Sequence, residues 1–171
     1  MARQGIAAAL SALALPLAAE KTPMKLTSPA FENHGTIPKR HTCDGQDSSP
    51  PLAWSDLPKS AKSLALIMDD PDAPLGTWVH WVLYDFSPEP PSFAVGKSRG
   101  ASGASWGVDS FSRSAWGGPC PPPGKPHRYF FRLYALNAAT GLPPGARKAQ
   151  LLDAMKGKIL ATAELVGFYG R

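Results

Sequence analysis

The 171-residue sequence has only two cysteines, no dense run of basic residues and only one long apolar stretch. Cys43 and Cys120 form neither a CxxC pair nor a Cys/His cluster with the spacing of a structural zinc site, so we expect no metal site and no cofactor. Lys and Arg are scattered along the chain, which argues against a nucleic-acid partner despite a net charge of +5. Two stretches, GKSRG at 96–100 and GASWG at 103–107, fit the letters of the GxSxG pattern, but neither joins a predicted strand to a predicted helix, so a serine nucleophile elbow is not indicated.

The single long apolar stretch lies at the N-terminus. Residues 6–19 carry no charged side chain, follow Arg3 and precede Glu20 and Lys21. This pattern is typical of a secretory signal peptide, and the stretch is shorter than the about 20 residues of a membrane-spanning helix. We therefore predict a leader over residues 1–19 and a periplasmic or secreted protein whose net charge is one unit lower than that of the full chain.

The rest of the chain, residues 20–171, has the length of one domain with one hydrophobic core. No later stretch is apolar for long enough to cross a membrane, so the mature chain is expected to lack a transmembrane segment. The alternative, in which the apolar stretch is the first element of the folded domain, corresponds to a cytoplasmic protein.

Sixteen glycines and 19 prolines indicate many turns, and four runs rich in β-branched and aromatic residues predict strands. The four runs span residues 63–68, 77–86, 129–136 and 159–166. A mostly antiparallel sheet is their natural assembly. Residues 147–156 predict one short helix before the last strand, with Leu151, Leu152 and Met155 facing the core. Residues 87–118 show little periodicity and predict a long irregular excursion.

Carboxylates gather between the first two predicted strands. Asp69, Asp70 and Asp72 close one strand and His80 lies inside the next, while neighbouring prolines stiffen the connection. A fixed carboxylate beside an imidazole orients the ring and raises its proton affinity, which makes it a better donor to an anion. Taken alone, the segment is more simply explained as an acidic turn followed by a core histidine.

A second segment, WGGPCPPPGKPHRY, precedes the third predicted strand. Gly117 and Gly118 leave room for a backbone to approach an oxyanion, and the prolines restrain the loop around His127. The plainer alternative is a proline-rich turn with His127 and Arg128 exposed at the start of a strand.

The two segments together resemble the phosphatidylethanolamine-binding protein family, and in particular its bacterial Raf-kinase-inhibitor-like branch. The motifs that carry the resemblance are DPDAP at 70–74, GTWVHW at 76–81, GGPCPPPG at 117–124, HRY at 127–129, CDGQDSSPPLAW at 43–54 and ELVGFYGR at 164–171. The segment 107–116 departs from the family pattern, which would place an asparagine near Val108 or Asp109 and a tyrosine at Trp116.

This resemblance implies a β fold in which a large antiparallel sheet packs on a smaller one. It also implies a cavity that accepts phosphate, sulfate, acetate or a phospholipid headgroup. The family's ligand-binding positions fall on Asp70, His80, Gly118, Pro119, His127 and Tyr169, and its supporting or pocket-lining positions fall on Asp72, Trp78 and Tyr129. Cys43 and Cys120 each lie beside one of these motifs, and the sequence leaves open whether they form a disulfide.

Three functions are compatible with these residues. The first is a protein that binds a small anion or phosphorylated headgroup and, as the branch name implies, modulates other proteins such as kinases. The second is an enzyme in which Asp70, His80 and His127 perform acid-base chemistry of the isomerase, lyase or hydrolase type. The third is an interaction module of the cell envelope whose loops bind a protein partner.

Overall fold

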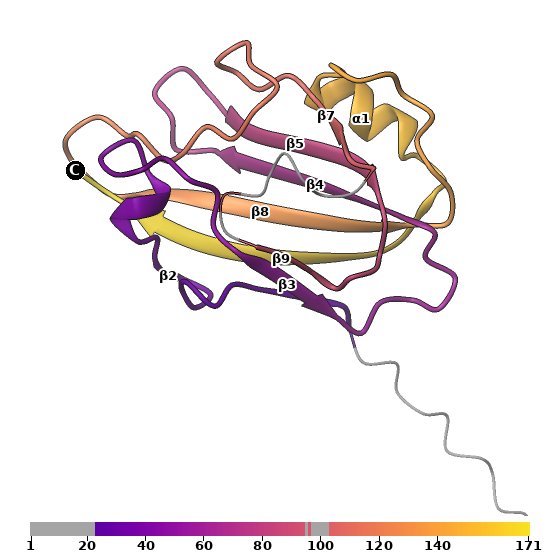
Figure 1. The fold of residues 1–171 in the computed structure, drawn as a ribbon. Coiled ribbons are helices and arrows are strands. Elements are labelled where there is room, and N and C mark those ends of the chain that lie inside the picture. The colour runs from indigo at the N-terminus through magenta and orange to yellow at the C-terminus, as the bar shows by residue number, and fades with distance from the viewer. Residues whose placement is uncertain (1–22, 95, 97–102) are drawn as a thin grey trace, which may run out of the picture.

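The computed structural model describes residues 23–94, 96 and 103–171. The predicted leader lies outside these residues. Two β-sheets and one short α-helix make up the described chain, in agreement with the predicted mostly β fold (Figure 1). Within the described residues, no helix is long and apolar enough to span a membrane.

The larger sheet contains six strands in the order β2-β9-β8-β4-β5-β7. Their bounds are Gly35–Thr36 (β2), Ile159–Tyr169 (β9), His127–Leu136 (β8), Ser63–Asp70 (β4), Trp78–Phe86 (β5) and Ser105–Trp106 (β7). The four long strands correspond to the four apolar runs of the sequence, and each neighbouring pair of them is antiparallel. Only β2 is parallel to its neighbour, β9.

The smaller sheet has three strands in the order β1-β3-β6, formed by Lys25–Thr27, Leu52–Ser55 and Ser92–Phe93. Its apolar side chains pack against one face of the larger sheet, where Trp54 of β3 joins Trp81 of β5 and Phe131 of β8 in a single cluster. Burial of these aromatic side chains is the main contribution to the stability of the two-sheet core.

The other face of the larger sheet is partly covered by α1, Lys148–Ala154. Leu151 and Met155 pack there against Ile67 of β4, whereas Leu152 is 37% exposed. The prediction that all three apolar residues of this helix face the core was therefore wrong for Leu152, because a single short helix buries only one narrow stripe. β4 is buried along its whole length because the smaller sheet covers one of its faces and α1 the other.

The predicted irregular excursion is not free of strands. It contains β6 and β7, which are two residues long and too short to produce a detectable alternation in the sequence. A three-residue 3₁₀ helix, η1, spans Lys39–His41 and leads into the segment that carries Cys43.

The sheet register brings the expected site residues to one end of the larger sheet. Asp70 at the end of β4 lies opposite Trp78 at the start of β5. His127 at the start of β8 lies opposite Tyr169 at the end of β9. Figure 1 shows this end of the sheet at the left, next to the C-terminus.

Candidate ligand pocket

A cavity of about 300 Å³ opens at this end of the larger sheet. Its wall comes from the turn after β4, from β5, from β8 and from two loops. The lining residues are Asp70, Ala73, Pro74, Leu75, Trp78, His80, Phe111, Cys120, Pro121, Pro122, His127 and Tyr129. The volume is at the lower end of the range for small-molecule sites.

Asp70 and His127 form a buried pair in this wall. The Nδ1 atom of His127 lies 2.7 Å from Oδ2 of Asp70, and their side chains are 11% and 4% exposed. The other oxygen of Asp70, Oδ1, accepts the backbone N–H of Asp72 at 2.8 Å. Because a carboxylate only accepts hydrogen bonds, Nδ1 carries the proton, and Nε2 is the ring atom left for a ligand.

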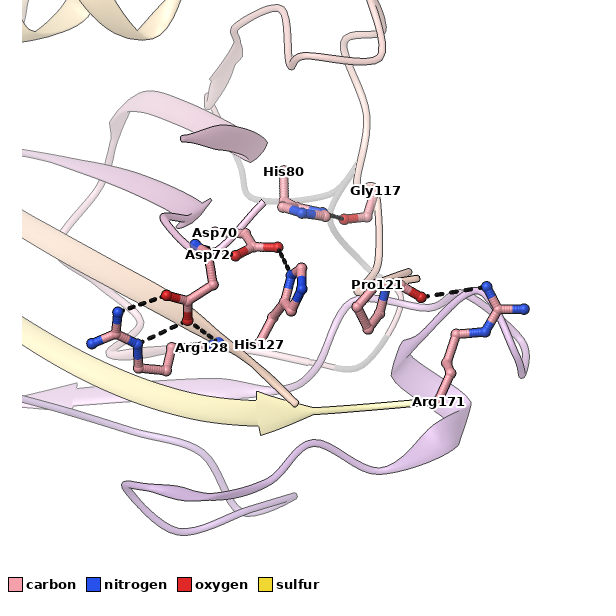
Figure 2. A network of polar contacts seen from close by, with 8 residues as sticks. All are labelled: Asp70, Asp72, His80, Gly117, Pro121, His127, Arg128 and Arg171. Atoms are coloured by element: carbon pink, nitrogen blue, oxygen red, sulfur yellow. Dashed lines mark hydrogen bonds and ion pairs between the residues drawn. The ribbon is translucent and has the colours of Figure 1, made fainter. Parts of the chain in front are cut away.

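Asp72 and Arg128 lock the turn after β4 onto β8. Oδ2 of Asp72 accepts the backbone N–H of Arg128 at 2.9 Å and its Nε–H at 2.8 Å, and Oδ1 accepts Nη2–H at 2.6 Å (Figure 2). The guanidinium lowers the pKa of Asp72 to about 2. Since Arg128 adjoins His127 and Asp72 donates to Asp70, this ion pair holds both members of the buried pair in place.

His80 lines the cavity from β5 and is buried. Its Nδ1 lies 2.7 Å from the carbonyl oxygen of Gly117. Burial lowers the pKa of His80, and the Gly117 carbonyl offsets part of this effect. The ring contacts Phe111 and Tyr129 edge to face, with centroid distances of 5.5 and 5.3 Å, so its orientation is fixed from both sides.

Tyr129 also lines the cavity, and its side chain is fully buried. Its hydroxyl has no hydrogen-bond partner among the residues that the structure describes. Burial raises the pKa of this phenol, so it stays protonated. An enclosed hydroxyl without a partner is costly to the folded state.

Three predicted ligand-binding residues lie behind the wall of the cavity. The N–H of Gly118 donates to Oδ1 of Asp47 at 2.9 Å, and the carbonyl of Pro119 accepts the N–H of Cys43 at 3.1 Å. The hydroxyl of Tyr169 donates to Asp44 at 2.7 Å. The N–H of Gly118 is therefore already bonded within the protein, and none of these three residues is among those that line the cavity.

Asp69, next to Asp70, points to the opposite face of the sheet, because successive side chains of a strand alternate. Its carboxylate accepts from Nη1 of Arg132 at 2.8 Å and from Lys148 of α1. Of the three carboxylates at the end of β4, therefore, only Asp70 lines the cavity.

Cys43 and Cys120 form a disulfide. Cys120 belongs to the wall of the cavity, so the bond ties that wall to the segment after η1. Arg171 supports the same wall, since its Nη1 donates to the carbonyl of Pro121 at 3.5 Å (Figure 2). Its Nε also lies 3.2 Å from Asp44.

The sequence prediction missed the apolar residues at the mouth of the cavity. Leu75 is 93% exposed, and Phe111 is 38% exposed and meets Trp78 edge to face. The sequence offered only weak indications of these residues. One is a leucine inside a proline- and glycine-rich turn, and the other is a single phenylalanine in a serine-rich loop.

Two residues in the segment that departs from the family pattern are anchors of the loop. Asp109 is buried and accepts the N–H of Arg113 at 2.8 Å. Trp116 is also buried, between Trp81 and Phe131 of the core. The loop that presents Phe111 is thus held at both ends.

A two-sheet β protein with a histidine- and aspartate-lined cavity at one end of the larger sheet is the class that this geometry defines. The profile of the phosphatidylethanolamine-binding protein family matches residues 27–170. The chain belongs to this family, which confirms the resemblance found in the sequence.

Curated relatives agree over most of the chain. The UPF0098 protein of Methanothermobacter thermautotrophicus is 46% identical over 151 residues, which are 86% of this chain and 99% of that protein. The UPF0098 protein of Aquifex aeolicus is 47% identical over 152 residues, which are 86% of this chain and 89% of that protein.

Solved structures confirm the fold. A phosphatidylethanolamine-binding protein homologue of Chlamydia trachomatis, CT736, superposes with a TM-score of 0.82 at 43% identity, over 87% of this chain and 98% of that one. YbcL of E. coli, a member of the mammalian PEBP family, superposes with a TM-score of 0.81 at 28% identity, over 88% of this chain and 99% of that one.

Proposed function

We propose that this protein binds a small anion, namely a phosphate-like or carboxylate group such as a phosphorylated headgroup, in the cavity at the end of the larger sheet. The observation that carries the proposal is the buried Asp70–His127 pair at 2.7 Å, which leaves Nε2 of His127 for a ligand. When His127 is protonated, this atom donates to an anion while Asp70 balances the ring charge.

The surroundings of the pair strengthen such an interaction. Proline, leucine and aromatic side chains make up much of the cavity wall. In an apolar environment a charge-assisted hydrogen bond is stronger than it is in water. A cavity of about 300 Å³ also leaves room for more than a bare phosphate, so the anion is expected to be part of a larger small molecule.

The test is a calorimetric titration of the purified protein with phosphate and with phosphoethanolamine at pH 6 and pH 8. Saturable heat at pH 6 that shrinks at pH 8 is expected, and the His127→Ala variant should lose it. His34→Asn is a matched control, because it removes an exposed imidazole outside the cavity at a positive φ of 62° that asparagine tolerates. No saturable heat in the wild-type protein, or equal heat in His127→Ala, would contradict the proposal.

The Asp70–His127 pair also supports a second candidate function, acid-base catalysis on a bound substrate. No described residue of the cavity wall is a serine, threonine or lysine, and its single cysteine is in the disulfide. A reaction that needs only proton transfer therefore fits this cavity better than one that passes through a covalent intermediate. Turnover of p-nitrophenyl acetate or p-nitrophenyl phosphate that His127→Ala abolishes would favour this candidate.

We also propose that the protein is exported. The uncharged apolar stretch at residues 6–19, which lies outside the family match at 27–170, and the Cys43–Cys120 disulfide support this location. N-terminal sequencing of the protein recovered from a periplasmic extract or from the medium would test it. A chain recovered only from the cytosol with its apolar stretch uncut would contradict export.

A further inference from the structure

The hydrogen bond made by His80 determines which of its ring atoms a ligand meets. Its Nδ1 lies 2.7 Å from the carbonyl oxygen of Gly117. A carbonyl has no proton to give, so Nδ1 carries the hydrogen and donates it. In the neutral ring, Nε2 then holds a lone pair, and no described residue donates a hydrogen bond to it. His80 therefore offers the cavity an acceptor.

Neutral His80 is the expected form near pH 7. The side chain is buried, which lowers its pKa, and this effect outweighs the opposing influence of the backbone at Gly117 and Gly118 and of two carboxylates. The two carboxylates are Asp70 on β4 and Asp109 in the loop before Gly117. From β8, the ring faces Tyr129, which is uncharged.

His127 offers a donor to the same cavity. It donates through Nε2 when it is protonated, because Nδ1 is engaged with Asp70. The cavity thus presents one acceptor, from His80, and one donor, from His127, to the same small volume of about 300 Å³.

We propose that this cavity selects an oxyanion that carries its own acidic hydrogen, namely a phosphomonoester in its monoanionic form, over anions of equal charge without such a hydrogen. This inference rests on the anion-binding function proposed above. The P–OH group donates to Nε2 of His80, and another phosphate oxygen accepts from Nε2 of His127.

Sulfate monoesters, phosphodiesters and carboxylates cannot make the same set of bonds. Each presents only oxygen lone pairs, one of which would face the lone pair of His80. Binding then requires either an unpaired buried acceptor or protonation of a buried ring. A single unmade buried hydrogen bond corresponds to a loss of about 5- to 150-fold in affinity.

The experiment compares phenyl phosphate with phenyl sulfate by calorimetric titration of the full chain at pH 6 and pH 8. The two probes share the aryl group, and the monoanion of the first differs from the second by the P–OH group. Because the second pKa of a phosphomonoester is about 6, much of the phenyl phosphate is monoanionic at pH 6 and little of it at pH 8. We expect at least a 10-fold preference for phenyl phosphate at pH 6, and a smaller one at pH 8.

Two variants separate the acceptor from the donor. His80→Leu removes the acceptor, so the ratio of the affinities for phenyl phosphate and phenyl sulfate should fall towards one. His127→Gln should weaken the binding of both probes and retain the preference for phenyl phosphate. Thermal unfolding checks that each variant folds, and if His80→Leu does not fold, the wild-type preference and its change with pH decide the question.

A lipid headgroup and a soluble ester can both supply a phosphomonoester. Dihexanoyl phosphatidic acid is a monoester and dihexanoyl phosphatidylethanolamine is a diester, so the first should bind more tightly. Whether phosphatidic acid binds more or less tightly than phenyl phosphate identifies the source, and either order supports the proposal.

Equal affinity of phenyl phosphate and phenyl sulfate at pH 6 would overturn the inference while anion binding stands. Tighter binding of the phosphatidylethanolamine than of the phosphatidic acid would also overturn it. Binding of none of the four probes would refute both the inference and the proposed function.

Discussion

The neighbouring residues Asp69 and Asp70 have different environments, although both are buried carboxylates at the end of one strand. Asp70 faces the cavity and binds His127, whereas Asp69 faces the opposite side and binds Arg132 and Lys148. This contrast provides a matched pair of substitutions that separates ligand binding from stability.

Asp70→Asn is expected to weaken the binding of phosphate by about 10-fold or more, because an amide neither balances the charge of His127 nor fixes its tautomer. Asp69→Asn is expected to retain the affinity and to lower the free energy of unfolding by about 2 kcal/mol. This is less than for a fully buried pair, because both cationic partners of Asp69 are partly exposed. Calorimetry and urea unfolding measure the two effects, and a loss of affinity in both variants would contradict the assignment.

His41 makes the stability of the fold depend on pH. It is completely buried, its Nδ1 lies 2.8 Å from the carbonyl of Ser48, and its Nε2 accepts from Arg40 at 3.0 Å. Burial lowers the pKa of His41, so the folded protein binds fewer protons here than the unfolded chain does. The stabilisation is complete above the unfolded pKa of about 6.5 and is lost as the pH falls towards the lower folded value.

Urea unfolding between pH 8 and pH 5 should therefore show a falling free energy of unfolding below about pH 6.5. His80, whose pKa is also lowered by burial, contributes in the same direction. His41→Asn should make the fall shallower. A pH profile of this variant parallel to that of the wild type would show that His41 is not responsible.

At the scale of elements, two connections determine the shape of the cavity. The Asp72–Arg128 ion pair joins the turn after β4 to β8, and the Cys43–Cys120 disulfide joins the proline-rich wall to the segment after η1. We assign no direct contact with a ligand to either connection. Each is therefore expected to act by holding the residues of the cavity wall in position.

Arg128→Leu should weaken phosphate binding several-fold, because Asp70 and His127 lose the restraint on their relative position. Arg128→Lys should restore only part of the affinity, since a lysine cannot reproduce the contacts of a guanidinium with both carboxylate oxygens. Calorimetry at pH 6 measures the series. Full affinity in Arg128→Leu would show that the turn keeps its position without the ion pair.

The disulfide closes a loop with a sequence separation of 77 residues. Replacing both cysteines with serine should lower the free energy of unfolding by about 2–4 kcal/mol, and reduction of the wild-type protein should have a similar effect. Phosphate affinity should also fall, because Cys120 belongs to the wall of the cavity. Urea unfolding with and without dithiothreitol measures the stability, and an effect of dithiothreitol on the serine variant would point to another cause.

At the scale of the whole molecule, the core and the cavity are separable. Trp54 belongs to the smaller sheet, donates from Nε1 to the carbonyl of Pro88 at 3.1 Å and packs on Phe86 and Phe93. Trp54→Ala should lower the free energy of unfolding by about 3–5 kcal/mol and leave phosphate affinity unchanged in the folded fraction. If calorimetry shows a loss of phosphate affinity under conditions in which Trp54→Ala is fully folded, the core and the cavity are not separable.

The sequence predicted the large-scale fold well because the long strands carry their own apolar pattern, as in β4 and β8. It did not predict β1, β2, β3, β6 or β7, which are two to four residues long and depend on their neighbours. The convergence of Asp70, His80 and His127 on one cavity came from the family resemblance, because spacing along a chain does not determine sheet register.

The details of the site depend on tertiary contacts that no local pattern contains. Gly118 falls on a ligand-binding position of the family, but Asp47, far away in the sequence, accepts its N–H. Leu75 and Phe111 have no motif of their own, and they line the cavity because the turn and the loop that carry them meet there.

The position of β9 within the larger sheet has a consequence for folding during synthesis. This strand, Ile159–Tyr169, lies between β2 and β8, although β2 precedes it by more than a hundred residues. β2 therefore cannot join the larger sheet until β9 has been synthesised, and the bond from Tyr169 to Asp44 spans a separation of 125 residues. Until β9 pairs, β8 has an unpaired edge, and pairing between such distant segments is slow. A partly synthesised chain therefore requires protection from aggregation at this edge.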